Sequence, residues 1–168
     1  MGHIKNLEHE EAAKKIKDIA LKIKVCHFCT QLGSKPFETR PMNTIDVDDD
    51  GNLWFFSGRY SHKDKDIRQD DDVQLLFGDT GNSTYMTVYG QADVFYDRQK
   101  VEELWTPIVK AWFTEGKDDD ELEIIRVKPQ DAYYWDTKHG KMVAFLKIAA
   151  AVITGKRMDD SVEGSARV

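Results

Sequence analysis

Short β-type stretches joined by turn sequences, with amphipathic helices between and after them, predict a mainly β, α+β fold for this chain of 168 residues. Two observations favour a small antiparallel barrel of about six strands with peripheral helices. The first half of the chain alternates β-branched and aromatic segments with hairpin turns such as Asp50-Gly51. No internal repeat or low-complexity linker divides the chain, so its length fits one domain over residues 1–168.

The elements follow in order along the chain. Apolar residues at helical spacing predict an amphipathic helix over about 6–23. The β-type stretches are residues 24–32, 37–47, 53–57, 73–77, 84–95, and 122–127 continued by 132–135 after an interruption at Pro129. Further helices are expected over about 63–69, 98–113 (N-capped by Asp97) and 142–154. The barrel core is thus placed at about 24–136, followed by the helix 142–154 and a loose polar tail over 156–168.

Two residues within these strands predict local irregularity. Pro41 cannot donate a ladder hydrogen bond, which points to an edge position or a bulge. Gly90, inside the longest strand, indicates a bulge or a close approach of another backbone.

Composition excludes several classes of function. Apolar residues make up 40% and charged residues 32% of the chain, as in ordinary globular proteins. The net charge of −6 argues against binding to nucleic acid or to an anionic membrane surface. No apolar run approaches the roughly 20 residues of a membrane helix, and no leader peptide is visible, so a cytoplasmic protein is expected.

The two cysteines, Cys26 and Cys29, have the spacing of a redox pair or of half a zinc site. The surrounding residues favour a strand, whereas a thioredoxin-type pair needs a helix N-terminus. No second pair of ligands exists for zinc, so packing thiols in a reducing compartment are expected.

Motifs for metal ions and for nucleophilic catalysis were also sought. Asp46, Asp48, Asp50 and Gly51 match the opening of a calcium loop, but Ser57 stands where the bidentate Glu is required. The histidines form no H-x-x-x-H pair, and no nucleophile elbow is present. No metal site and no Ser–His–Asp chemistry are therefore predicted.

A phosphate site is suggested by Arg40, Ser61 and Lys63. If the strand of Arg40 pairs in a hairpin with the strand at 53–57, a guanidinium, a hydroxyl, an ammonium and the N-terminus of the helix at 63–69 converge. The alternative is ordinary surface pairing of these cations with Asp64, Asp66 or the acids at 70–72. Spacing alone leaves both interpretations open.

Five segments resemble the general stress protein 26 group of the pyridoxamine 5′-phosphate oxidase-like flavoproteins. They are R-P-M-x-T from Arg40, L-W-F-F-S-G-x-x-S-H-K from Leu53, G-x-A-x-V from Gly90, V-E-E-L-W-T-P-I-V-K-A-W-F-T-E-G from Val101 and R-V-K-P-Q-D-A-Y-Y-W-D from Arg126. The resemblance runs from about residue 29 to residue 136, with the segments in the family's order, and the W-x-P-x-x-K-A-W-F-x-E-G block is the most specific.

The resemblance implies an FMN-binding split barrel that forms a homodimer with two sites between the subunits. It places Arg40, Pro41 and Met42 along the isoalloxazine ring, with Arg40 also toward the phosphate. Phe56 and Ser57 would follow the ring edge and ribityl chain. The full set of cofactor-binding residues that it implies is Arg40, Pro41, Met42, Thr44, Phe56, Ser57, Ser61, His62, Lys63, Trp105, Lys110, Trp112 and Trp135.

Within that set, Ser61, His62 and Lys63 would bind the phosphate, and the tryptophans with Lys110 would close the site, from the same or the partner subunit. Core or dimer packing is the alternative for Trp105 and Trp112, which would lie on one face of a helix at 98–113.

Several functions remain open under this resemblance. An FMN-dependent oxidoreductase of unknown substrate, with no assigned catalytic residue, is the leading hypothesis, and a non-catalytic flavin-storage or redox-sensing stress protein is the alternative. A deazaflavin-dependent reductase is less favoured. Pyridoxamine phosphate oxidation is doubtful, because residues 134–140 lack the Arg-rich substrate clamp of the true oxidases.

Overall fold

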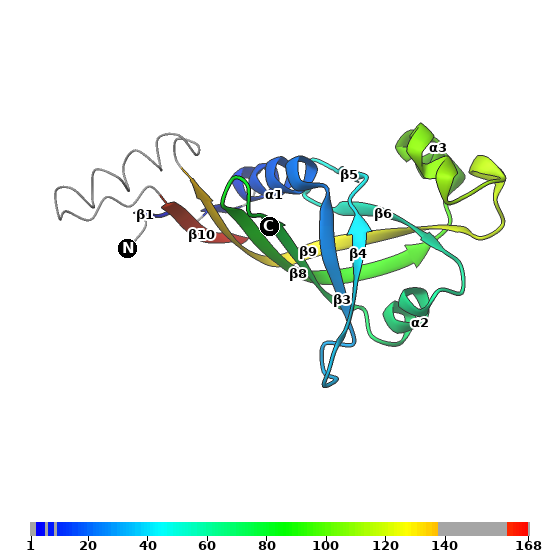
Figure 1. Cartoon of the computed structure of the whole chain (residues 1–168), viewed down its shortest axis with the longest axis horizontal. Helices are drawn as coiled ribbons and strands as arrows, with labels where there is room; N and C mark the ends of the chain where they lie inside the picture. Colours follow the sequence, from blue (N-terminus) through cyan, green and yellow to red (C-terminus); the bar gives the residue numbers. More distant parts are fainter. Residues whose placement is uncertain (1–2, 6, 9, 138–160, 168) are drawn as a thin grey trace.

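The computed structural model describes residues 3–5, 7–8, 10–137 and 161–167. In this part of the chain, one sheet of ten strands is flanked by three α-helices and two short 3-10 helices (Figure 1). The strands are β1 (His3–Ile4), β2 (Leu7–Glu8), β3 (Val25–Thr30), β4 (Glu38–Asn43), β5 (Asp46–Val47), β6 (Leu53–Gly58), β7 (Asp72–Asp79), β8 (Thr84–Phe95), β9 (Leu122–Thr137) and β10 (Ser161–Arg167). The helices are α1 (Glu10–Ile23), α2 (His62–Gln69), α3 (Arg98–Leu104), η1 (Pro107–Ala111) and η2 (Gly116–Asp118).

The sheet is almost entirely antiparallel. Its strand order is β1-β10-β9-β8-β7-β3-β4, and only the short strands β1 and β2 pair in parallel, both with β10. β9 is shared: one edge pairs with β8, while the other edge pairs with β6 near Leu122 and with β10 near Thr137. The six predicted strands correspond to β3, β4, β6, β7, β8 and β9, so the predicted fold class is confirmed.

Two hydrophobic clusters hold these elements together. The larger lies between the sheet and α1, which buries a stripe of small and branched residues that includes Ala12, Ile16 and Ile19. At its centre the rings of Phe28 and Phe55 meet edge to face with centroids 5.3 Å apart. Each such fully buried side chain contributes about 1.5–3 kcal/mol to folding, which explains why the α1 stripe is apolar.

The smaller cluster packs α3 and η1 against the end of the sheet where β6 pairs with β9. Its buried members are Trp54, Val101, Leu104, Val109, Phe113, Leu122 and Ile124. Trp54 is fixed from behind by the turn between β5 and β6, because the Asp48 carboxylate accepts hydrogen bonds from the Trp54 indole and from the Asn52 amide. In the acidic turn that resembled a calcium loop, the Asp48 carboxylate therefore accepts hydrogen bonds from the protein's own N–H groups.

The expected helix over 98–113 is wrong as a single element. α3 ends at Leu104, Trp105 is extended (φ −65°, ψ 126°), and η1 begins at Pro107. The physical reason is that a proline disfavours the α conformation at the residue before it and removes a backbone donor. Trp105 and Trp112 therefore do not share a helix face.

The expectations for the irregular strand positions were partly right. The register between β8 and β9 shifts at Tyr89/Gly90, and a Cβ atom at Gly90 would lie 2.2 Å from the Lys128 carbonyl oxygen, so the bulge and the close approach are both confirmed. The predicted interruption of β9 at Pro129 is wrong, because this bulge accommodates the proline opposite Gly90. Pro41 lies in β4 at the end of the strand order, which confirms its edge position.

The premise of a hairpin between the strand of Arg40 and that of Phe56 is also wrong. β4 pairs with β3, with Arg40 opposite Phe28, and only the two residues of β5 pair with β6. Arg40 is instead linked to α2 by its ion pair with Asp66, as described below.

The ends of the chain differ from expectation. The first helix begins at Glu10 and stops where Lys24 takes a left-handed conformation (φ 68°) and its amide bonds to the Ala20 carbonyl. The tail expected to be loose contains β10, which pairs with β9. The helix expected over 142–154 lies outside the described residues. Among the helices described, none has the length and apolar character needed to cross a membrane.

Candidate functional site

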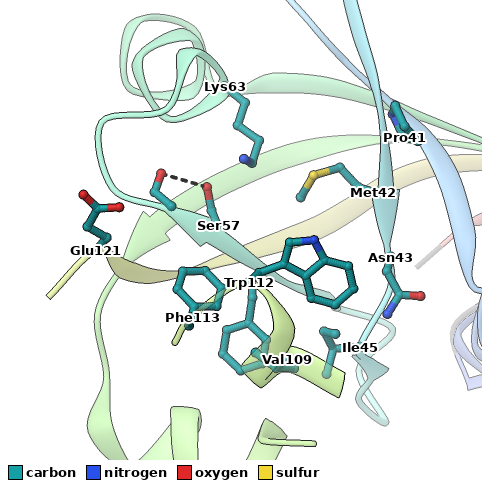
Figure 2. A pocket seen from close by; sticks show the side chains of 12 residues that line it. Pro41, Met42, Asn43, Ile45, Ser57, Lys63, Val109, Trp112, Phe113 and Glu121 are labelled. Atoms are coloured by element: carbon teal, nitrogen blue, oxygen red, sulfur yellow. Dashed lines mark hydrogen bonds between the residues drawn. The ribbon is translucent and has the colours of Figure 1, made fainter. Parts of the chain in front are cut away.

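A pocket of about 370 Å³ opens between β4, the end of β6, the start of α2 and the segment around η1 (Figure 2). This volume lies within the range of small-molecule sites, roughly 300–1,000 Å³. Its lining residues are Pro41, Met42, Asn43, Ile45, Phe56, Ser57, Gly58, Lys63, Val109, Trp112, Phe113 and Glu121. One end is therefore apolar and aromatic, and the other carries hydroxyl and ammonium groups.

The polar end is formed by the start of α2. The Ser61 side chain caps the helix, accepting a hydrogen bond from the Asp64 amide at 3.3 Å. The His62 and Lys63 amides make no hydrogen bond to other groups in the described chain and, as first-turn donors, they carry the positive end of the helix dipole. An anion placed here would meet free N–H groups.

Lys63 points from this helix turn into the pocket, above Ser57 (Figure 2). Burial lowers the pKa of its ammonium, and the nearby positive charge of Arg40 lowers it further, while Asp64 acts in the opposite direction. Lys63 forms no ion pair with any carboxylate of the described residues, in contrast to Arg40, Arg59 and Arg68. It is thus a partly desolvated cation without a counter-ion, directed at an open volume.

Two hydroxyl groups complete the polar end. Ser57, which is almost fully buried at the end of β6, has its Oγ atom 3.4 Å from Ser61 Oγ and 3.4 Å from the Gly58 carbonyl oxygen. Both contacts are long for hydroxyl hydrogen bonds, so the donor of Ser57 is only weakly engaged.

Arg40 precedes the lining residue Pro41, does not itself line the pocket, and is hydrogen-bonded to two partners. Its Nη1 donates to Thr30 Oγ1 at 2.6 Å, and its Nη2 donates to Asp66 Oδ2 at 3.1 Å. Thr30 in turn donates to the same Asp66 oxygen at 2.7 Å, which closes a triangle between β3, β4 and α2. The pairing alternative raised from the sequence therefore holds for Arg40 and Asp66, whereas Lys63 forms no such pair with a described carboxylate.

Two carboxylates close to the polar end are buried, those of Asp64 and Glu123; the sequence analysis named Asp64 only as a surface partner and did not name Glu123. Asp64 pairs with Arg68, and Glu123 pairs with both Arg59 and Arg68. Since these acids already have arginine partners, they do not neutralise Lys63. The sequence shows Arg59 and Arg68 only as surface-like charges, and no local pattern reveals the pairing across 64 residues between Arg59 and Glu123.

The apolar wall comes from three separate segments. Met42 lies on β4, Val109 and Trp112 lie in and after η1, and Trp112 remains 66% exposed at the pocket mouth. Phe56 forms the floor and packs edge to face on both Trp105 and Phe113.

The structure brings together about half of the residues that the sequence analysis expected at the cofactor. Six line the pocket: Pro41, Met42, Phe56, Ser57, Lys63 and Trp112. Ser61 and Arg40 lie immediately beside it, and Trp105 lies behind Phe56 without reaching the cavity. The pocket residues that were not anticipated are Asn43, Ile45, Gly58, Val109, Phe113 and Glu121, of which Val109 and Phe113 lie in the segment that carries the most specific motif.

The side chains of the remaining four expected residues do not line the pocket. His62 and Lys110 are exposed, on α2 and η1. Thr44 is buried, with its amide bonded to the Lys24 carbonyl and its hydroxyl near the Cys26 thiol, where no described group gives it a regular hydrogen bond. Trp135 stacks on Tyr133 at the other end of β9, roughly 40 Å along the strand from the pocket.

Both cysteines are buried and free, as expected of packing thiols. Burial raises the pKa of Cys26 to about 12, with a smaller contribution from Cys29 in the same direction. A thiol held protonated in this way is unreactive.

Comparison with known proteins agrees with this geometry. Residues 11–159 match the family model described as pyridoxamine 5′-phosphate oxidase like. General stress protein 26 of Bacillus subtilis is 24% identical over 128 residues, covering 74% of this chain and 89% of that protein. Protein bli-3 of Neurospora crassa is 28% identical over 113 residues, covering 62% of this chain and 54% of that protein, so the match spans about half of its length.

Solved structures share the fold. A protein described as a candidate general stress protein 26 from Jannaschia sp. CCS1 superposes with a TM-score of 0.77 at 21% identity, covering 94% of this chain and 96% of that one. The general stress FMN/FAD binding protein of Xanthomonas citri superposes with a TM-score of 0.64 at 24% identity, covering 74% and 87%. The resemblance noted from the sequence motifs is confirmed: the chain belongs to the pyridoxamine 5′-phosphate oxidase-like family and, by the names of its relatives, to the general stress protein 26 group.

Proposed function

We propose that the pocket binds FMN, with the phosphate at the start of α2 and the isoalloxazine ring along the apolar wall. The observation that carries this proposal is Lys63, a partly buried ammonium without a counter-ion at the polar end of an otherwise apolar pocket. Such a group favours a ligand that has both an anionic end and a planar apolar body. The name of the Xanthomonas citri relative, an FMN/FAD binding protein, supports the same ligand class.

Each part of the pocket has a role in this proposal. Lys63, with the free amides of His62 and Lys63, would bind the phosphate, and the hydroxyls of Ser57 and Ser61 would bind the phosphate or the ribityl chain. Met42 and Trp112 would exclude water from the ring. The bound flavin itself supplies hydride or electron transfer, and the chain supplies position and electrostatics.

We propose further that a second copy of the chain covers the site. Trp112 is 66% exposed and Ile108 is 60% exposed at or beside the pocket mouth, which is unusual for large apolar side chains unless a partner or ligand contacts them. Trp135 and Lys110, which do not reach the pocket of their own chain, could complete the site of a partner. Light scattering with and without FMN tests this homodimer, and a monomer at micromolar concentration in both states would refute it.

Whether the bound flavin turns over is a separate question. Only Lys63 and Glu121 among the described lining residues are ionisable, and neither is paired with a second proton-transfer group. The lining is therefore as consistent with the non-catalytic alternative, a flavin-storage or redox-sensing protein, as it is with an oxidoreductase. Anaerobic reduction by NADH or NADPH, followed by reoxidation with a quinone or nitro compound, separates the two: absence of reduction by either donor favours storage or sensing.

The central proposal is tested by binding. The purified protein is titrated with FMN, FAD and riboflavin by fluorescence quenching, and any copurified chromophore is released and identified by mass. FMN should bind more tightly than riboflavin, because only FMN offers the phosphate that Lys63 can bind. Equal affinity for FMN and riboflavin would show that Lys63 does not bind phosphate, and no binding of any flavin would refute the function proposed.

A further inference from the structure

We propose that Asp66 limits the affinity of this site for a ligand phosphate, because it holds Arg40 in an ion pair that the phosphate must share or displace. This inference rests on the proposed function and adds to it a residue that determines how tightly the phosphorylated end is held. It predicts a site in which, among the described residues, Arg40 is committed to an acid when the ligand is absent and Lys63 is not.

The geometry places Arg40 within reach of the polar end but commits it elsewhere. Its guanidinium is close enough to Lys63 to contribute to the lowered pKa of that ammonium. Yet its hydrogen bonds are to Thr30 and Asp66, neither of which lines the pocket. Its side chain is 21% exposed and that of Asp66 is 19% exposed, so the pair is substantially shielded from water.

The triangle of contacts gives Asp66 its hold on Arg40. Thr30 is fully buried and donates to Asp66 while it accepts from Arg40, so each of the three side chains is hydrogen-bonded to the other two. A charge-assisted pair with a bridging hydroxyl is stronger than an exposed surface pair, in which both partners have water as an alternative.

The charges around the polar end show why the Arg40–Asp66 pair would weaken phosphate binding. Arg40, Arg59 and Arg68 are each paired with an acid, and Lys63 is the remaining cation of the polar end. A phosphate monoester carries nearly two negative charges at neutral pH. Lys63 alone cannot neutralise it, so tight binding requires a second cation, and Arg40 is the described cation whose charge acts on Lys63.

The experiment compares FMN with riboflavin in four forms of the full chain: the wild type, D66N, R40Q and the double variant R40Q/D66N. Asn retains the shape of Asp and an acceptor for Arg40 but removes the charge. We expect D66N to lower the Kd for FMN by roughly three- to tenfold and to leave the Kd for riboflavin unchanged. The gain should disappear in the R40Q background, because it depends on the released guanidinium.

A matched control accounts for the change in net charge. Asp131 is exposed on β9 and makes no contact recorded among the described residues, so D131N changes the total charge by the same amount without touching the site. D131N should leave both affinities unchanged. Thermal melting of each variant shows that the folded state is retained.

The outcomes are distinct. If the wild type binds neither flavin, the proposed function fails and this inference fails with it. If the wild type binds FMN in preference to riboflavin but D66N weakens FMN binding or leaves it unchanged, the proposed function stands and the role of Asp66 is refuted. A gain that persists undiminished in R40Q/D66N would equally refute the part assigned to Arg40.

Discussion

Replacement of Lys63 by Met should weaken FMN binding while leaving the folded protein as stable as before, or more stable. Met has a similar length and no charge, so the variant removes the ammonium but still fills the space beside Ser57 and Met42. In most proteins the loss of a charged, half-buried side chain destabilises the fold. Weaker FMN binding together with unchanged or increased stability would therefore be specific to the role proposed for Lys63.

The size of the binding effect follows from the role proposed for Lys63. One hydrogen bond between charged partners contributes about 1.5–3 kcal/mol, which corresponds to a loss of roughly 10- to 160-fold in affinity for FMN. Riboflavin lacks the phosphate, so its affinity should change by less than about threefold. The ratio of the two dissociation constants isolates the phosphate contact from any change in the shape of the pocket.

The stability effect has the opposite sign for a stated reason. Burial and Arg40 lower the pKa of Lys63, which means that the folded state without ligand disfavours the charged form relative to the unfolded chain. Removing the group therefore removes a cost. Urea unfolding at pH 7 and flavin titration at the same pH measure both quantities, with K14M as the matched control, since Lys14 is exposed on α1, away from the pocket. A K63M variant that loses stability and loses FMN and riboflavin affinity equally would refute the reasoning.

Three further predictions follow from the packing of the fold. Gly90→Ala should destabilise the protein by about 1–3 kcal/mol or more in urea unfolding, because its Cβ would lie 2.2 Å from a carbonyl oxygen of β9; Gly33→Ala, with no atom within 4 Å of the added Cβ, should change stability by less than half of that. Burial raises the pKa of Cys26 from 9.0 to about 12, so the stability that its protonated thiol contributes is complete below pH 9 and is lost as the pH rises from 9 toward 12. Across that window the free energy of unfolding of the wild type should fall by about 1.4 kcal/mol per pH unit more than that of Cys26→Ala. Parallel curves of stability against pH for the two proteins would contradict the burial of this thiol. Glu123→Ala should cost about 2–4 kcal/mol in thermal or urea unfolding, since it leaves two arginines without their buried partner, whereas Glu102→Ala, at an exposed pair on α3, should cost under about 0.5 kcal/mol.

The strand pattern was predictable because it depends on local chemistry. Apolar runs bounded by turn residues mark β3, β6, β7 and β8 within a few positions, and Gly90 marks the bulge without reference to any other part of the chain. The errors came where a distant partner decides the local state. Pro129 reads as a break in isolation, and it is the opposing strand that allows β9 to continue past it.

Site residues in contiguous motifs could be predicted from the sequence. Residues whose contacts join elements that are distant along the chain could not. Met42, Ser57 and Lys63 belong to motifs that the sequence displays directly, and all three line the pocket. The engagement of Arg40 by Asp66 joins β4 to α2 across 26 residues, and charge patterning along the chain cannot specify which of several nearby acids is used. The helix break at Pro107 was visible in the sequence but was outweighed by the apolar periodicity, which misplaced the two tryptophans relative to each other.

One edge of β9 is divided between two partner strands, and this division has a consequence for local unfolding of the sheet. The strand is hydrogen-bonded to β6 over Leu122–Val127 and to β10 over Ala132–Thr137, with the register shift against β8 in the gap between these two segments. Amide protons of the first segment are protected by the sheet that supports the pocket, and those of the second by the chain's last described strand. Native-state hydrogen exchange should therefore resolve β9 into two separately opening units, and ligand binding should slow exchange in the first without slowing it in the second.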